Sequence, residues 1–144
     1  MRIVITFPFA LSTPGGGTED AAELARALAL LGAEVALVTP DCGGPERFPR
    51  RRAPPSEQGR ERAERLAEAG VELATSAPHP LHFRLDGRGV RAAEAERLAT
   101  RPADALLGYW HEAYHLPQLA RERGALFAMT GAASFSQFFS PGRG

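Results

Sequence analysis

The chain has 144 residues, the length of one domain that buries roughly 70% of its unfolded surface on folding. Hydrophobic residues make up 44% of it, which excludes a disordered or fibrous chain. Acidic and basic residues number 17 each, so no net charge draws the chain toward nucleic acid, and no nucleic-acid partner is expected.

The first elements along the chain form a strand–helix–strand unit. Residues 2–7, "RIVITF", are a β-branched run typical of a strand covered on both faces. The next segment places apolar residues at helical spacing, namely Ala21, Leu24, Ala25, Leu28 and Leu31. We expect Gly17 or Thr18 to cap this helix and Gly32 to end it. Residues 34–39, "EVALVT", predict a second buried strand, and this order implies a right-handed crossover in a parallel sheet.

The remainder of the chain continues to alternate between helix and strand. Residues 41–57 are rich in proline, glycine and arginine and predict a mobile surface loop. The later predicted elements are a helix near 58–69 with a stripe of Ala63, Leu66 and Ala67, a strand at 71–75, a hairpin at 81–90, a helix near 91–99, a strand at 103–110, a helix at 116–124 and a strand at 125–131. This alternation predicts one α/β domain over residues 1–144, a Rossmann-like parallel sheet with helices on both faces.

Gly15, Gly16 and Gly17 stand between the first strand and the first helix, at the edge where ligands of open parallel sheets bind. Bare backbone permits the close approach of a ligand, and a helix N-terminus offers unpaired N–H groups to an anion. The glycines are contiguous, which disagrees with the spacing of a dinucleotide fingerprint. From these residues alone, a flexible turn before a helix that begins with Glu19 and Asp20 is an equally good interpretation.

Residues 109–115, "YWHEAYH", carry the densest group of reactive and aromatic side chains in the sequence. His111, Glu112 and His115 match the H-E-x-x-H spacing of zinc sites, but a proline follows too closely for the long helix of such a site. We therefore expect no metal. One interpretation is that Trp110 stacks on a sugar ring or a nucleobase while His111 or Glu112 bonds hydroxyl groups. The other is that these aromatic side chains simply close the end of the sheet.

Several function classes are excluded by what the sequence lacks. The chain has no lysine, which excludes a Walker phosphate loop and a Schiff-base mechanism. Cys42 is the only cysteine, which excludes a disulfide framework. No apolar run reaches the roughly 18 residues of a membrane span, and no signal peptide precedes the first strand, so we expect a cytoplasmic protein. Arg50–Arg52 allow a peripheral contact with a membrane, although such a triplet is usually a solvated surface.

The stretches "MRIVITFPF" and "PGGGTEDAAELARALALLGAEV" together resemble the opening of family 4 glycosyltransferases of the GT-B fold. Their N-terminal half begins with such a strand, a loop ending in G-G-x-E, and a helix reading E-L-A-R-A-L-A-x-x-G-x-E-V. "PADALLGYWHEA" is similar to the family's P-D-V-V-H-x-H strand end, and "LARERGALFAMTG" to its A-x-x-x-G-x-P-x-V-x-T-x-H segment. The resemblance thus covers residues 1–40 and 102–131.

This resemblance implies the acceptor-side, N-terminal domain of an enzyme that moves a sugar from a nucleotide-sugar donor to a sugar or lipid-linked acceptor. No cofactor beyond the nucleotide sugar is implied. A C-terminal GT-B domain or a partner chain would complete the donor site, so the domain is expected to be incomplete and inactive alone. His111 and Glu112 are the candidates for catalysis. The substrate-binding residues that the resemblance implies are Gly15, Gly16, Gly17, Thr18, Trp110, His111, Thr130 and Gly131.

The chain departs from the family pattern at two strand ends. Leu107 and Tyr109 stand where the family has histidines, and Gly131 and Ala132 follow Thr130 where the family has another. These departures favour an alternative, a non-catalytic binding or regulatory module that pairs with another chain. Its contact would be a tail with phenylalanines at helical spacing, namely Phe135, Phe138 and Phe139. A dinucleotide-binding domain is a third hypothesis, which the glycine spacing disfavours.

Overall fold

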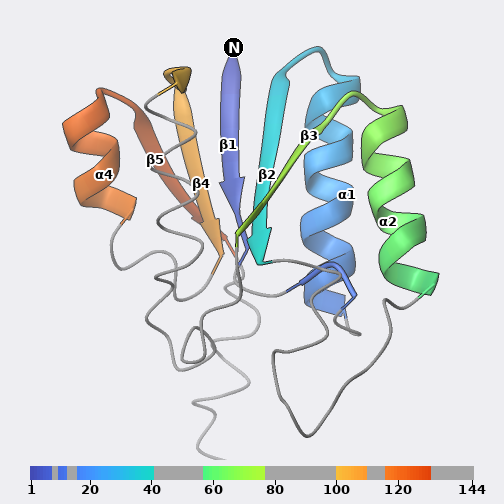
Figure 1. Ribbon diagram of the computed structural model, residues 1–144. Helices are drawn as coiled ribbons and strands as arrows, with labels where there is room; N and C mark the ends of the chain where they lie inside the picture. Colours follow the sequence, from blue (N-terminus) through green and yellow to red (C-terminus); the bar gives the residue numbers. More distant parts are fainter. Residues whose placement is uncertain (8–9, 13–15, 41–56, 77–99, 110–115, 131–144) are drawn as a thin grey trace, which may run out of the picture.

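Five parallel strands form one sheet in the order β3-β2-β1-β4-β5 (Figure 1). The computed structural model describes residues 1–7, 10–12, 16–40, 57–76, 100–109 and 116–130. The strands are β1 (Arg2–Thr6), β2 (Glu34–Pro40), β3 (Glu72–Ser76), β4 (Ala105–Tyr109) and β5 (Leu126–Thr130). The helices are α1 (Gly16–Leu30), α2 (Glu57–Glu68) and α4 (Leu116–Arg123). The predicted Rossmann-like α/β sheet is therefore confirmed.

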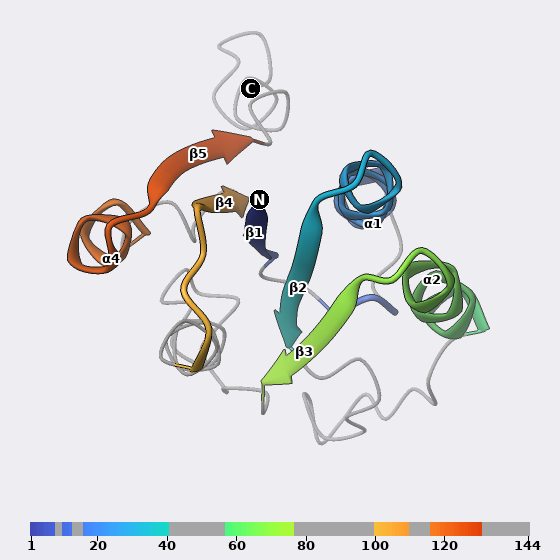
Figure 2. The same cartoon turned by 90° about the horizontal axis from the view of Figure 1, so that it is seen from above.

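Helices cover both faces of the sheet, as predicted. Seen from above, α1 and α2 lie beside β1, β2 and β3 on one face, and α4 lies on the opposite face beside β4 and β5 (Figure 2). Successive strand residues point to opposite faces, so Ile5 packs in the core beneath α1 and α2 while Val4 packs in the core with α4. The molecule thus has a hydrophobic core on each side of the sheet.

β1 is buried along its whole length because it is the central strand. All of its residues are buried, and it pairs with β2 on one side and with β4 on the other. The β-branched sequence suits a strand that contacts side chains on both faces. The expectation that residues 2–7 form a doubly covered strand is confirmed.

Apart from the start of α1, the predicted elements agree with the observed ones to within two residues at each end for every strand and helix that the structure describes. One correction concerns the predicted loop at 41–57, because Glu57 already belongs to α2. The rest of that loop lies outside the described residues. So do the predicted hairpin at 81–90, the predicted helix near 91–99 and the phenylalanine-containing tail.

The ends of α1 correct two further predictions. The helix begins at Gly16, so Gly17 and Thr18 lie inside its first turn and do not cap it. The helix ends at Leu30, and Leu31, in the turn that leads to β2, is 83% exposed. Gly32 has a φ of +102°, so the prediction that it ends the helix in a left-handed conformation is confirmed.

The buried side of α2 also differs from the predicted stripe. Leu66 is buried as expected, but Ala67 is exposed and Arg62 is buried in its place. Positions 59, 62 and 66 recur at spacings of three and four, so they share one face of the helix. A charged side chain therefore occupies a position on the inner face of α2. The pattern of apolar residues alone did not predict that Arg62 is buried there.

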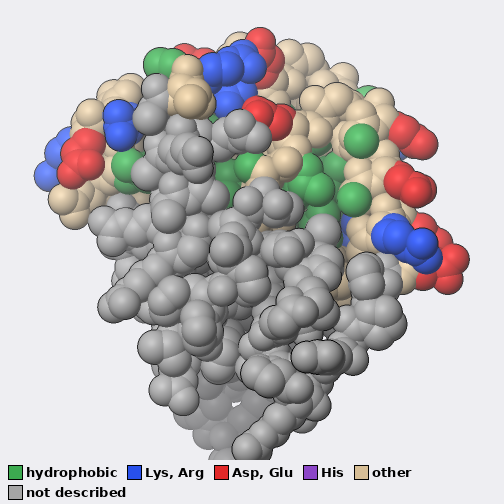
Figure 3. Space-filling view, in the orientation of Figure 1, with side chains coloured by type: hydrophobic (Ala, Val, Ile, Leu, Met, Phe, Trp, Pro, Cys, Tyr) green, Lys and Arg blue, Asp and Glu red, His purple; other side chains and the backbone are tan. Residues whose placement is uncertain are grey.

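The amino ends of the strands are held by charged side chains. The backbone N–H of Arg2 donates to the Asp104 carboxylate at 2.7 Å, and the Arg2 guanidinium donates to Glu72 at 3.4 Å. Arg101 pairs with Glu34 beside them. In the space-filling view, basic and acidic side chains gather above this end of the sheet (Figure 3). These ion pairs close the end of the sheet at which ligands of parallel sheets do not bind.

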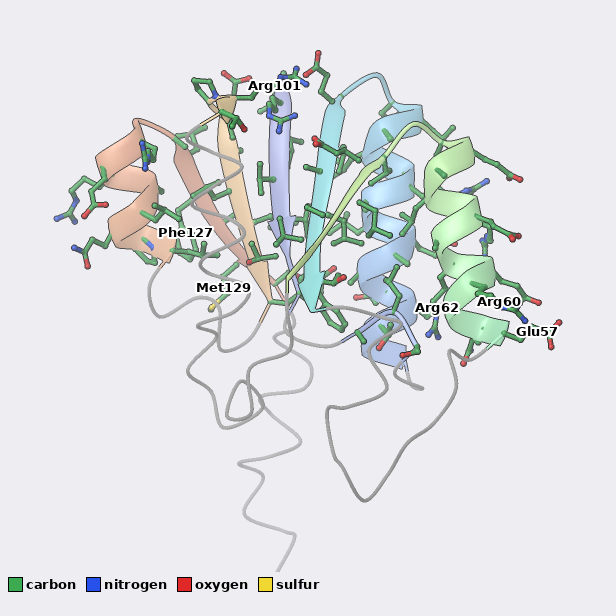
Figure 4. The ribbon with its side chains drawn as sticks, in the orientation of Figure 1. Glu57, Arg60, Arg62, Arg101, Phe127 and Met129 are labelled. Carbon is green, nitrogen blue, oxygen red and sulfur yellow. The ribbon has the colours of Figure 1, made fainter. Side chains whose placement is uncertain are left out.

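β5 is an edge strand with exposed apolar side chains. Leu126, Phe127 and Met129 are all exposed, and β5 pairs only with β4 among the described strands. Phe127 and Met129 are labelled in Figure 4, where both lie at the edge of the sheet. An edge without charge, proline or a bulge is a surface on which another polypeptide can pair.

A substitution in the exposed strand β5 should change the free energy of unfolding less than a substitution in the neighbouring strand β4. Met129 is 58% exposed whereas Leu106 on β4 is fully buried. We expect Met129→Arg to change the free energy of unfolding by less than about 0.5 kcal/mol, as at other open surface positions. Leu106→Ala should lower it by about 3 kcal/mol, because it leaves a cavity in the core. Urea denaturation measures both, and equal losses would contradict the exposed position of Met129.

Candidate functional site

The carboxyl ends of β1 and β4 form the point at which the chain reverses its direction across the sheet. Thr6 of β1 lies opposite Gly108 of β4 in the register, so both strands end at the same level. From β1 the chain passes to β2 on one side, whereas from β4 it passes to β5 on the other. Open parallel sheets bind ligands at such a reversal, because the two departing loops leave space between them. We take this edge as the candidate site.

Two aromatic rings pack together at this edge. Phe7 follows β1 and donates its backbone N–H to the carbonyl of Val38 at 3.0 Å, which continues the ladder beyond the strand. Its ring meets that of Tyr109 at the end of β4, with ring centroids 5.4 Å apart and planes at 88°. Both side chains are buried. This edge-to-face contact is a favoured geometry for aromatic pairs and ties β1 to β4 where the loops depart.

Tyr109 has a strongly perturbed ionisation. Burial raises the pKa of the Tyr109 phenol to about 12, and the negative charge of Asp20 in α1 adds to the increase. The phenol therefore stays protonated at neutral pH and is not a base there. Tyr109 packs in one core cluster with Ala21 and Ala22, so the first turns of α1 lie close to the end of β4.

The N-terminus of α1 presents bare backbone at this edge. Gly16 begins the helix and is exposed, Gly17 is half-buried, and Thr18 is buried. A Cβ atom placed on Gly16 would have no atom of the described chain within 4 Å. Packing against the described residues therefore does not require glycine at this position. The first turn of a helix also leaves N–H groups without intrahelical partners.

Glu19, the acidic residue of the glycine motif, pairs with α2. Its carboxylate accepts from Arg62 Nε at 2.9 Å and lies 3.6 Å from Arg65 Nη1. Arg65 also pairs with Glu23, one turn further along α1. The negative charge that follows the glycines is therefore compensated by a neighbouring helix.

Arg62 and Gly59 hold the segment between β1 and α1 from the side of α2. The Arg62 guanidinium is buried and donates from Nη1 to the carbonyl oxygen of Leu11 at 2.7 Å. Gly59 contacts Ser12, the residue after Leu11. A Cβ atom on Gly59 would lie only 2.9 Å from Ser12 Cα. The early turns of α2 therefore fix the path of residues 11–12 toward the glycines.

The structure brings together part of the predicted site. Gly16, Gly17 and Thr18 lie at the start of α1, on the carboxyl side of the sheet. Thr130 ends β5, where it lies opposite Tyr109 in the register, one strand further from α1. The other predicted residues lie outside the described residues, namely Gly15, Trp110, His111, Glu112 and Gly131. For these the roles implied by the resemblance stay predictions.

Sequence reasoning missed the contributions of Gly59 and Arg62. A signal was present, because position 62 lies four residues before Leu66 on the apolar face of a predicted helix. An arginine at such a position, with acidic residues on the preceding helix, indicates a buried ion pair. The close contact at Gly59 had no sequence signal, because glycine in a first turn is commonplace.

Two further findings concern metals and membranes. Within the described ranges, no group of three or more His, Cys, Asp or Glu side chains is placed to hold a metal ion. A search of the same ranges finds no helix long and apolar enough to cross a membrane.

Comparison with known proteins gives a structural likeness. The chain matches no protein-family model and no curated protein. It is similar to a solved structure of the glycotransferase of kitacinnamycin, with a TM-score of 0.53 and 18% sequence identity. The match covers 89% of this chain and 30% of that chain, so this chain spans less than a third of that protein's length. At this identity the likeness is one of fold, and this α/β parallel sheet resembles part of that glycotransferase.

The contact between Gly59 and Ser12 predicts an unusual result for an alanine substitution. Alanine normally stabilises a helix by about 1 kcal/mol relative to glycine. At Gly59 the added methyl group must displace the backbone of Ser12, which typically costs about 2 kcal/mol. We expect Gly59→Ala to lower the free energy of unfolding, measured by urea denaturation. Gln58→Ala, at an exposed position in the same turn, is the control, and a stabilised Gly59→Ala would contradict the close contact.

The raised pKa of Tyr109 predicts a loss of stability at high pH. Below pH 10.0 the phenol is protonated in both the folded and the unfolded chain, and up to about 12 only the unfolded chain releases its proton. The free energy of unfolding should therefore fall by about 1.4 kcal/mol per pH unit across this window on account of Tyr109.

Tyr109→Phe tests this assignment, because it removes the phenol and keeps the ring contact with Phe7. Denaturation of both proteins between pH 10.0 and about 12 gives the comparison. The variant should lose less stability than the parent chain as pH rises. Identical slopes would show that Tyr109 is not buried in the protonated form. Tyr114 is present in both proteins, so its own titration cancels.

Proposed function

We propose that this chain is the N-terminal, acceptor-side domain of a family 4 glycosyltransferase of the GT-B fold. The observation that carries the proposal is the glycine motif at the start of α1, at the reversal point of a sheet similar to that of a glycosyltransferase. The reaction would move a sugar from a nucleotide-sugar donor to a sugar or lipid-linked acceptor. The protein would act in the cytoplasm, in contact with a membrane where the acceptor is lipid-linked.

The position of Gly16 supports a ligand beside the first turn of α1. The described part of the chain leaves open space next to this residue, and the first turn of a helix directs unpaired N–H groups toward the same place. A diphosphate is the part of a nucleotide sugar that such a turn would bind. Glu19 does not oppose an anion there, because Arg62 and Arg65 compensate its charge.

In this proposal the chain supplies one half of the enzyme. The similar glycotransferase is more than three times as long as the part that this chain matches. A C-terminal domain or a partner chain would hold the rest of the donor, and Trp110, His111 and Glu112 would face the acceptor. Catalysis would need both halves, because the reacting atoms must be held between them.

The exposed edge of β5 favours a second candidate function, a binding module without activity of its own. Leu126, Phe127 and Met129 offer an apolar strand edge to another polypeptide. Such a module would bind its partner without binding a nucleotide. The two candidates therefore differ in whether the chain has affinity for nucleoside diphosphates.

Gly16→Ala tests the proposed ligand position without disturbing the fold. The methyl group meets no described atom of the chain, so the variant should be at least as stable as the parent chain. We expect it to weaken the binding of uridine or guanosine diphosphate at least tenfold, about 1.4 kcal/mol, because the methyl group occupies the ligand's space.

The measurement is a titration of the isotope-labelled chain followed by nuclear magnetic resonance, which detects weak binding. In the parent chain, the amide signals of Gly16, Gly17 and Thr18 should shift on addition of the diphosphate. Ala27→Ser, at an exposed position further along α1, is the control and should bind as the parent does. Equal affinities of the parent and Gly16→Ala for the diphosphate would show that it does not bind beside Gly16. No binding of either nucleotide by the parent would favour the binding module.

A further inference from the structure

Gly59 and Arg62 lie on the side of α2 that faces α1. They are three residues apart, both are buried, and they contact the segment before the glycines and the first turn after them. In the view with side chains, Arg62 points toward α1, whereas Arg60 and Glu57 lie on the outer side of α2 (Figure 4). Arg60 is exposed and thus provides a matched control for Arg62 on the same helix.

The guanidinium of Arg62 joins two parts of the chain that the glycines separate. Nη1 donates to the carbonyl of Leu11 at 2.7 Å, and Nε donates to the carboxylate of Glu19 at 2.9 Å. The residue is only 3% exposed. Burying a guanidinium is costly unless it is paired and hydrogen-bonded, so these contacts are strongly favoured once Arg62 is inside. Arg62 therefore contacts the chain on both sides of the glycines, at Leu11 and at Glu19.

The same contact sets the charge beside the first turn of α1. An acid in a first turn stabilises a helix but repels a second anion at the same place. Glu19 is that acid, and its carboxylate is 43% exposed. Arg62 lies on its buried side and Arg65 on its exposed side. Because water and salt screen an exposed pair more than a buried one, Arg62 is the more effective of the two.

We propose that Arg62 is a positioning residue for the anionic part of the ligand, acting through Leu11 and Glu19 without touching the ligand. It fixes the backbone of residues 10–12 and cancels the charge of Glu19, so that the N-terminus of α1 accepts a diphosphate. This inference rests on the proposed function. A merely structural ion pair would affect stability alone, and removing its second member would not restore binding.

The closing experiment combines two variants of Arg62 with two measurements. Arg62→Met removes the charge and keeps the length of the side chain, and Glu19→Gln with Arg62→Met removes both charges. Arg60→Met is the matched control. The first measurement is amide hydrogen exchange of Ala10, Leu11 and Ser12 in the absence of ligand. The second is the dissociation constant for uridine and guanosine diphosphate.

We expect Arg62→Met to weaken diphosphate binding about tenfold, because Glu19 then repels the ligand. The double variant should bind only about threefold more weakly than the parent chain, since the repulsion is gone while the loop remains unrestrained. Amides of residues 10–12 should exchange faster in both variants than in the parent. Arg60→Met should match the parent chain in both measurements.

Each contrary result overturns a defined part of the proposal. A double variant that binds no better than Arg62→Met would overturn the cancellation of charge. Unchanged exchange at residues 10–12 in Arg62→Met would overturn the restraint of the loop. A parent chain that binds neither diphosphate, while Arg62→Met still speeds exchange at residues 10–12, would overturn the proposed function and leave the restraint standing.

Arg62→Lys covers the case in which Arg62→Met does not fold. Lysine keeps the positive charge near Glu19, but its single ammonium group does not reproduce the two-sided geometry of the guanidinium. We expect diphosphate binding within about threefold of the parent together with faster exchange at residues 10–12. A tenfold loss of binding with unchanged exchange would contradict the proposal.

Discussion

Parallel pairing on both sides of β1 is the constraint on which the rest of the structure depends. β1 pairs with β2 and with β4, so the chain crosses the sheet first one way and then the other. Because crossovers between parallel strands are right-handed, the helices of these two passages lie on opposite faces. All strands then end at the same edge, and the chain leaves β1 and β4 in opposite directions. The packing of Phe7 against Tyr109 closes the sheet at that reversal.

Charge acts differently at the two ends of the sheet. At the amino end, Arg101 and Glu34 are exposed, and exposed ion pairs contribute little to stability because water screens them. At the carboxyl end, Arg62 is buried between α1 and α2, where an unpaired charge is costly. The first arrangement holds strand ends together and tolerates change. The second connects Leu11, the first turn of α1 and α2, so a substitution at Arg62 should alter the contacts of all three.

The sequence predicted the described strands and helices because their patterns reflect local physics. Apolar β-branched runs indicated β1 and β2, and Gly32 indicated the end of α1. It did not predict what depends on contacts between distant segments. Leu31 matched the helical spacing but lies past the point where the chain turns, and Arg62 is polar yet buried because Glu19 and Leu11 are there to bind it. For the candidate site, the sequence predicted the glycines and Thr130, whose roles stay predictions, whereas Gly59 became apparent only from the approach of Ser12.

Two glycines at this edge illustrate why residue type alone does not reveal a site. Gly59 is required by the chain itself, because any side chain there would strike the backbone of Ser12. Gly16 begins a helix, and a Cβ atom placed on it would have no atom of the described chain within 4 Å. Packing within the described chain therefore explains the first glycine and not the second. In the proposed function, bare backbone at Gly16 admits a ligand that approaches the start of α1. The proposed ligand is thus best sought at Gly16, while Gly59 and Arg62 hold Leu11 and Ser12 in place.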